Sequence, residues 1–273
     1  MNDNNKRVMA LLWVVVICWV PVSVSAKTMV LIHGYMASGD VWSHSGVIAR
    51  LQRRGWSFAG RYGYDHQANI VRELQQQSGN VVVTVELPWQ APVAQQGELL
   101  QRYLNEIHRD HPGPQVLVGH SAGGVVARYV VVRYGRRHVD ALVSIASPHL
   151  GTPMAELAVI ASESPLGFLM QDLGDPILIR SRALFADLVP ARQGSFLAWL
   201  NQQRHPDLAY YSIVRSEVPV DLSRFDQADL VVPADYQDMN NVPALQGGAV
   251  KIDSDGGHAL VARDADRVLN LIK

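Results

Sequence analysis

The chain has 273 residues with a formal net charge of −1, and 48% of its residues are hydrophobic and 18% charged. This length and composition are typical of one large domain with a substantial core. Basic residues form no run longer than pairs such as Arg53-Arg54 and Arg136-Arg137. Because nucleic-acid binding needs a basic surface, we expect no nucleic-acid partner.

Residues 1–26 have the three-part pattern of a secretory signal peptide. Lys6 and Arg7 precede the apolar run VMALLWVVVICWV, and Val24 and Ala26 occupy the −3 and −1 positions of a small-residue cleavage site. We expect cleavage there and export of residues 27–273 to the periplasm or the medium. The alternative is an uncleaved N-terminal membrane anchor, which would leave the same domain outside.

Cleavage would also remove Cys18, the only cysteine of the sequence. The exported chain would then have no disulfide bond, no thiolate metal site and no cysteine nucleophile. We therefore expect the core alone to stabilise the fold.

Apolar runs rich in β-branched residues recur after residue 27 and are typical of buried parallel strands. The expected strands are TMVLI (28–32), VVVTVEL (81–87), QVLVG (115–119), VDALVSIA (139–146), AYYSIVR (209–215) and AVKID (249–253). Helical patterns lie between them at 95–110, directly after Ser121, and at 263–273. This alternation predicts an α/β fold, with a mostly parallel central sheet flanked by helices.

Residues 152–208 separate two expected strands and are far longer than an ordinary connection. Their apolar residues include Leu157, Ile160, Leu166, Phe168, Leu169 and Met170. We expect a helical insertion at about 152–205. It is either an extra layer of the core or a cap over the site, and its point of entry favours the cap.

The stretch VLVGHSAGGVVARY, residues 116–129, places Ser121 between an expected strand and an expected helix. A strand–turn–helix setting for Gly-x-Ser-x-Gly is typical of a nucleophile elbow. The strained turn brings Gly119 and Gly123 close together, so both must be small. We predict that Ser121 is a nucleophile in a turn supported by His120. The alternative is a turn of small residues without a chemical role.

A nucleophilic serine needs donors for the oxyanion that forms on the attacked carbonyl. The first expected strand ends in His33-Gly34-Tyr35, where the chain must turn sharply. By position, we assign the oxyanion donors to the backbone amides of Tyr35 and Ala122. We expect His33 and Gly34 to support this loop.

Several segments resemble the lipases and esterases of the α/β-hydrolase superfamily. They occur in the family's order and are VLIHGY (30–35), the stretch at 116–129, IASPHLGTPMA (145–155), GSFLAWLN (194–201), DLVVP (229–233) and GGHALV (256–261). The resemblance implies an α/β-hydrolase fold and a cap after the GTP segment. It also makes Ser195 a helix N-cap instead of a site residue.

In this fold the nucleophile is followed by an acid and then by a histidine. His258 is the only histidine after His205 and follows the last expected strand, so we predict that it is the base. The candidate acids after the strand at 209–215 are Asp221, Asp226, Asp229 and Asp235. Asp229 resembles the family's acid loop and is our choice, with Asp226 as the alternative. Its carboxylate would accept the imidazole N–H.

Asp253 and Asp255 lie too close before His258 to be the preferred acid. They could fix the histidine loop or bind calcium, as in some related lipases. Because the sequence lacks a full calcium-loop pattern, we predict no metal ion.

We expect an exported serine hydrolase that cleaves small-molecule or lipid esters through an acyl-enzyme on Ser121. It would need no cofactor and could contact a membrane or lipid interface transiently. One alternative is a thioesterase or acyltransferase with the same triad. Against it, its substrate acyl-CoA is cytosolic, and the sequence has no basic cluster to bind the phosphates of acyl-CoA. A non-catalytic binding protein on a hydrolase scaffold would lack a triad member, whereas all three are present.

Overall fold

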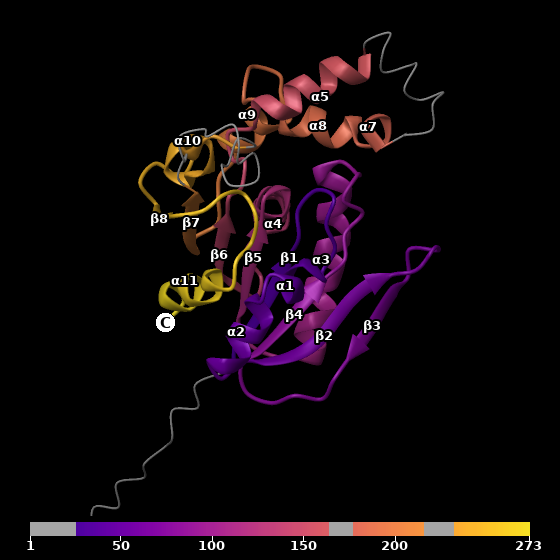
Figure 1. Cartoon of the computed structure of the whole chain (residues 1–273), viewed down its shortest axis with the longest axis vertical. Coiled ribbons are helices and arrows are strands. Elements are labelled where there is room, and N and C mark those ends of the chain that lie inside the picture. The colour runs from indigo at the N-terminus through magenta and orange to yellow at the C-terminus, as the bar shows by residue number, and fades with distance from the viewer. Residues whose placement is uncertain (1–25, 164–176, 216–231) are drawn as a thin grey trace, which may run out of the picture.

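The structure is a computed structural model that describes residues 26–163, 177–215 and 232–273. These residues form an 8-stranded sheet in the order β3-β2-β4-β1-β5-β6-β7-β8 (Figure 1). The strands are β1 (Thr28–Ile32), β2 (Ser57–Tyr64), β3 (Ile70–Leu74), β4 (Val81–Val85), β5 (Gln115–His120), β6 (Val139–Ile145), β7 (Ala209–Arg215) and β8 (Ala249–Ser254). Neighbouring strands are parallel, except that β2 and β3 are antiparallel. The chain therefore has the predicted α/β-hydrolase fold.

All the expected strands are confirmed, with ends that differ by at most two residues. The hairpin of β2 and β3 was not predicted from the sequence. Strand β2, SFAGRYGY, contains Gly60 and Gly63 and has no continuous apolar run. Strand β3 is almost entirely exposed at the edge of the sheet, so it lacks the burial that makes a strand recognisable.

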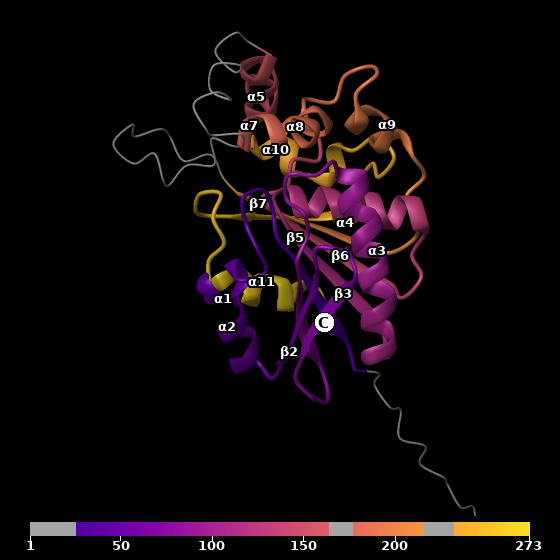
Figure 2. The same ribbon diagram turned by 90° about the vertical axis from the view of Figure 1, so that its right-hand side faces the viewer.

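The two faces of the sheet are covered by different helices, which Figure 2 shows on opposite sides of the strands. Helices α3 (Val93–Asp110) and α4 (Ala122–Tyr134) pack on one face. Helices α1 (Val41–His44), α2 (Val47–Arg53) and α11 (Arg263–Leu271) pack on the other. Along β1, Val30 and Ile32 join the first cluster and Met29 and Leu31 the second, as the two-residue period of a strand requires.

The helices of the expected insertion lie between β6 and β7, above the carboxyl ends of the strands (Figure 1). They are α5 (Pro153–Glu163), α7 (Ile177–Arg180), α8 (Arg182–Leu188) and α9 (Phe196–Gln202). Helix α5 packs on α8, while Leu184, Leu188, Leu197 and Leu200 join the core. The segment thus contributes to the core, and its action as a cap stays a prediction. Leu166, Phe168, Leu169 and Met170 lie outside the described residues.

The expected signal peptide, residues 1–26, lies outside the described residues except for Ala26. Within the parts of the chain that the structure describes, every helix is too short or too polar to cross a bilayer. Cleavage, export and membrane anchoring therefore stay predictions.

Candidate active site

Ser121 lies in a strained turn between β5 and α4. Its φ is 52° and its ψ −130°. This backbone conformation is unfavourable for any residue other than glycine. Its amide donates to the carbonyl oxygen of Ile145 at 2.9 Å, which ties the turn to the end of β6. The serine is half-buried. The surrounding structure maintains this strain.

Glycines make this turn sterically feasible. A methyl group built on Gly119 would lie 2.5 Å from the Cα of Gly124. One on Gly123 would lie 2.7 Å from the carbonyl oxygen of Ile32, and one on Gly34 would lie 2.8 Å from the Cβ of Ser121. The absence of side chains therefore lets the β1–α1 loop lie directly against the serine.

The amides assigned to the oxyanion flank this contact. Ala122 is the first residue of α4, so its N–H has no acceptor within the helix and lies at the positive end of the helix dipole. The amide of Tyr35 follows Gly34 and has no hydrogen-bond acceptor among the described residues. The Tyr35 ring packs edge-on against Trp89 at 5.2 Å and against Phe185 of α8 at 5.1 Å, which fixes the turn.

His33 supports the same loop through both ring nitrogens. Its Nδ1–H donates to the carbonyl oxygen of Gly34 at 2.9 Å, and its Nε2 accepts from the amide of Leu87 at 3.0 Å. Burial lowers the pKa of His33 below its usual value. Glu86 lies 3.7 Å from Nε2, but a nitrogen that accepts a hydrogen bond is unprotonated, so the contact is not an ion pair. His33 therefore connects the Gly34 loop to the end of β4.

His258 meets Ser121 across the carboxyl ends of the strands. The two residues are 137 positions apart in sequence, yet Nε2 of His258 lies 2.9 Å from Oγ of Ser121. This distance is a hydrogen bond, in which the hydroxyl donates when the imidazole is neutral. The structure thus brings together the predicted nucleophile and the predicted base.

His120 contacts the loop of His258 as well as forming part of the elbow. Its Nε2–H donates to the carbonyl oxygen of His258 at 2.8 Å, and the two rings lie 5.1 Å apart. Burial lowers the pKa of His120 to about 4. A neutral His120 therefore links the two segments, a contact for which the sequence contains no signal because its partner is a backbone atom.

The chosen acid, Asp229, and the alternatives Asp226 and Asp221 lie outside the described residues. Asp235 is exposed near the start of α10 (Ala234–Gln237). Asp253 pairs with Lys251 at 3.1 Å. Among residues 26–163, 177–215 and 232–273, no group of three or more His, Cys, Asp or Glu side chains could hold a metal ion.

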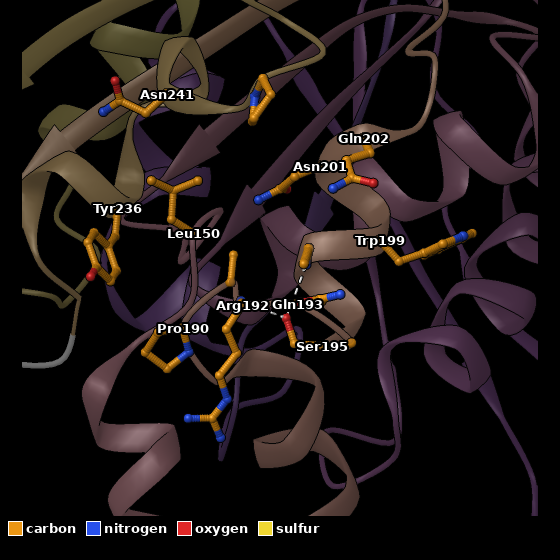
Figure 3. Close-up of a pocket in the computed structure, with 14 residues that line it drawn as sticks. Leu150, Pro190, Arg192, Gln193, Ser195, Trp199, Asn201, Gln202, Tyr236 and Asn241 are labelled. Carbon is orange, nitrogen blue, oxygen red and sulfur yellow. Dashed lines mark hydrogen bonds between the residues drawn. The ribbon is translucent and has the colours of Figure 1, made fainter.

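A cavity of about 740 Å³ lies between α9, the loop that precedes it, and α10 (Figure 3). It is lined by Leu150, Pro190, Ala191, Arg192, Gln193, Gly194, Ser195, Ala198, Trp199, Asn201, Gln202, Tyr236, Asn241 and Pro243. Ser195 accepts hydrogen bonds from the amides of Ala198 at 3.2 Å and Arg192 at 3.1 Å, so the expected N-cap is confirmed. This cavity contains neither Ser121 nor His258.

A second cavity, of about 680 Å³, adjoins the Tyr35 turn. It is lined by Ala37, Ser38, Tyr64, Asp65, His66, Ala68, Glu86, Leu87 and Trp89. Ala37 and Ser38 continue the loop that carries Tyr35, and Trp89 packs on the Tyr35 ring. Of the two cavities, this one is joined directly to the proposed oxyanion turn.

Neutral buried histidines make the fold sensitive to acid. Burial lowers the pKa of both His120 and His205 to about 4. Below pH 6.5 the unfolded chain binds protons that the folded chain does not, so stability should fall as the pH drops from 6.5 towards 4. Each histidine contributes at most about 1.4 kcal/mol per pH unit.

Urea unfolding at pH 7, 5.5 and 4.5 measures this loss. His205→Gln retains a hydrogen-bond acceptor but removes one titrating group, so its free energy of unfolding should fall less steeply than that of the wild type. Parallel curves for the two proteins would contradict this assignment.

A mostly parallel sheet, a strained serine between β5 and α4, and a histidine after the last strand together define an α/β-hydrolase. The chain has the fold of this superfamily, and a model of the PGAP1-like α/β domain matches residues 58–161.

Solved structures of lipases and esterases share the fold. The mature Bacillus licheniformis lipase BlEst2 is 15% identical with a TM-score of 0.60, over 90% of this chain and 91% of that one. A lipase-esterase related protein from Clostridium acetobutylicum is 14% identical with a TM-score of 0.52, over 91% and 96% of the two chains. The fold of this chain therefore resembles that of lipases and esterases.

A relative was also found by sequence. The chain is 26% identical over 132 residues to the lysosomal thioesterase PPT2 homolog of Drosophila melanogaster. The alignment covers 48% of this chain and 39% of that relative, so less than half of each protein is compared.

Proposed function

We propose that the protein is an exported serine hydrolase that cleaves carboxylic esters through an acyl-enzyme on Ser121. The observation that carries this proposal is the 2.9 Å contact between Oγ of Ser121 and Nε2 of His258, made from a strained turn against Gly34. A serine hydroxyl becomes a competent nucleophile when an adjacent base accepts its proton. The fold alone would not support an activity, because many functions share it.

In the proposed reaction, Oγ of Ser121 attacks the ester carbonyl carbon while its proton passes to His258. The amides of Tyr35 and Ala122 donate to the oxyanion of the tetrahedral intermediate. Collapse of the intermediate breaks the ester bond, and the alcohol leaves with the proton from His258. Water then attacks the acyl-enzyme with His258 as base, which releases the carboxylic acid and restores the serine.

Asp229 is the proposed acid, with Asp226 as the alternative. Its carboxylate would accept the Nδ1–H of His258, fix the imidazole tautomer and stabilise the imidazolium. The support is the position of Asp229 in the ADLVVP segment, between the nucleophile and the histidine. No cofactor takes part in this mechanism.

Apolar residues on α5 support a lipid-like substrate and a transient lipid-interface contact. Met154, Leu157 and Ile160 recur every three residues, so they share one side of the helix. Their exposed fractions are 48%, 58% and 59%. A large contiguous apolar patch on a protein surface is typical of a protein–protein or membrane interaction site. We place this helix in the proposed cap, above the carboxyl ends of the strands.

Thioester hydrolysis is the second candidate, and the lysosomal thioesterase relative favours it. The same triad would serve, with a thiolate as the leaving group. Acyl-CoA is a cytosolic substrate, so the proposed export of residues 27–273 argues against it. Export does not argue against other thioesters.

Paired substrates test both candidates. We would measure hydrolysis of p-nitrophenyl esters from acetyl to palmitoyl, and of thioesters with the same acyl chains. The proposed function predicts faster ester than thioester turnover, and an increase in rate when a long-chain ester passes its solubility limit. Faster turnover of every thioester would replace the proposal by the second candidate, and no turnover of either series would overturn both.

A further inference from the structure

We propose that the buried ion pair of Arg215 and Asp264 positions His258 for catalysis. The pair connects the end of β7 to the start of α11 and spans the loop that carries His258. The inference rests on the proposed function, because it assigns a positioning role for the reaction at Ser121. Neither residue contacts Ser121 in this arrangement.

Arg215 donates hydrogen bonds on both sides of His258 in the sequence. It is the last residue of β7, and its side chain is 0% exposed. One guanidinium nitrogen donates to Oγ of Ser254 at 2.9 Å and to the carbonyl oxygen of Asp255 at 3.5 Å. The other donates to the carbonyl oxygen of Ala259 at 3.4 Å. These acceptors flank His258 on both sides in the sequence.

Asp264 completes the contact at the far end of the loop. Its side chain is also 0% exposed, and Oδ2 lies 2.6 Å from the second guanidinium nitrogen of Arg215. The same oxygen accepts from the amide of Val261 at 2.9 Å, while Oδ1 accepts from Arg267 at 2.8 Å. The loop 255–261 is therefore bonded at its beginning, beside His258 and at its end.

The backbone amide of Arg215 is also linked, through Gln237, to Val232. Its amide donates to Oε1 of Gln237 at 2.7 Å, and Nε2 of Gln237 donates to the carbonyl oxygen of Val232 at 2.8 Å. Arg215 and Val232 are the described residues on either side of the segment that contains Asp229. Arg215 is thus bonded both to the loop of the proposed base and, through Gln237, to Val232.

Stability alone does not account for this pair. Burying two charges costs desolvation free energy that is about as large as the gain from their attraction. A protein with an apolar pair of similar volume in place of a buried ion pair is therefore often equally stable. Orientation is a better explanation, because the guanidinium presents its donors in a fixed plane. A displacement of about 1 Å in a catalytic group can lower the rate about 100-fold.

Asp264→Asn is the first test, with Asp266→Asn as its control. Asp266 lies on the same helix and pairs with Arg50 at 2.8 Å and Arg54 at 2.7 Å, but among the described residues it makes no hydrogen bond or ion pair with the loop 255–261. We expect Asp264→Asn to lower kcat about 100-fold with little change in KM, and the control to retain the wild-type values. Equal kcat values for the two variants would overturn the proposal.

A double variant, Arg215→Met with Asp264→Leu, covers the case in which Asp264→Asn fails to fold. Removing both charges avoids an unpaired buried arginine. We expect it to fold, to show a similar loss of kcat, and to exchange the amide hydrogens of residues 255–261 at least tenfold faster than the wild type. Wild-type kcat or wild-type exchange in this variant would overturn the proposal.

Hydrogen exchange distinguishes a failure of the proposed function from a failure of the positioning role of the ion pair. If the wild type hydrolyses neither esters nor thioesters, the proposed function fails, and with it the catalytic part of this inference. Faster exchange in the double variant would then still show that the pair holds the loop.

Discussion

Replacing Ser121 with alanine is expected to lower kcat for ester hydrolysis by about 10⁶-fold, the scale of loss seen when a serine nucleophile is removed from a triad. The reason is that His258 would have no hydroxyl to deprotonate, although the amides of Tyr35 and Ala122 would still be in place. Steady-state kinetics on a short-chain nitrophenyl ester measures the loss. Urea unfolding should give nearly the wild-type free energy, because alanine and serine both carry a Cβ in the strained turn.

Ser195→Ala is the matched control for this substitution. Ser195 caps α9 and has no contact with His258, so we expect unchanged kcat and a loss of about 1 kcal/mol in the free energy of unfolding. A Ser121→Ala protein with wild-type turnover would show that the elbow has no nucleophile. A well-folded variant that retains a large fraction of kcat would indicate a mechanism without an acyl-enzyme on this residue.

Gly123→Ala should lower the free energy of unfolding by about 3 kcal/mol, because its new methyl group has no room. That group would lie 2.7 Å from the carbonyl oxygen of Ile32 and closer still to that of His33. Both acceptors belong to the backbone of β1 and its following loop, which cannot move without disturbing the sheet. Thermal or urea unfolding of the variant measures the effect.

Gly63→Ala provides the comparison for this steric argument. A methyl group at Gly63 would meet only the side chain of Glu86, at 3.8 Å, which is an ordinary contact. We expect a change within about 0.5 kcal/mol. If both glycines tolerated alanine equally, the close packing of the elbow against β1 would not determine its stability.

The buried strands could be predicted from the sequence because burial on both faces leaves a readable apolar run. Strands such as VVVTV at 81–85 have no polar face, so their pattern is unmistakable. The hairpin of β2 and β3 gives no such signal, since Gly60 and Gly63 interrupt the pattern and β3 is exposed. The order of the strands depends on packing between segments distant in sequence, and periodicity contains no information about it.

The candidate site was predictable where a local motif marks it. Ser121 is marked by its glycines, and His258 by its place after the last strand, and these two residues meet at 2.9 Å. Arg215 and Asp264 were not singled out, because each forms part of an ordinary strand or helix pattern. The signal available was a charged residue at the end of the otherwise apolar run AYYSIV, which is an uncommon place for an unpaired charge.

The separation of 137 residues between Ser121 and His258 makes hydrolysis a reporter of complete folding. The serine follows β5, whereas the histidine follows β8, so the two side chains meet only after the strands between them have paired. Contacts of such long range are costly in chain entropy and form late. A fragment that ends before β8 would contain the nucleophile and both oxyanion amides yet no base. During refolding, recovered turnover would therefore report only molecules with a complete sheet. The recovered helical circular dichroism signal would also include partly folded molecules.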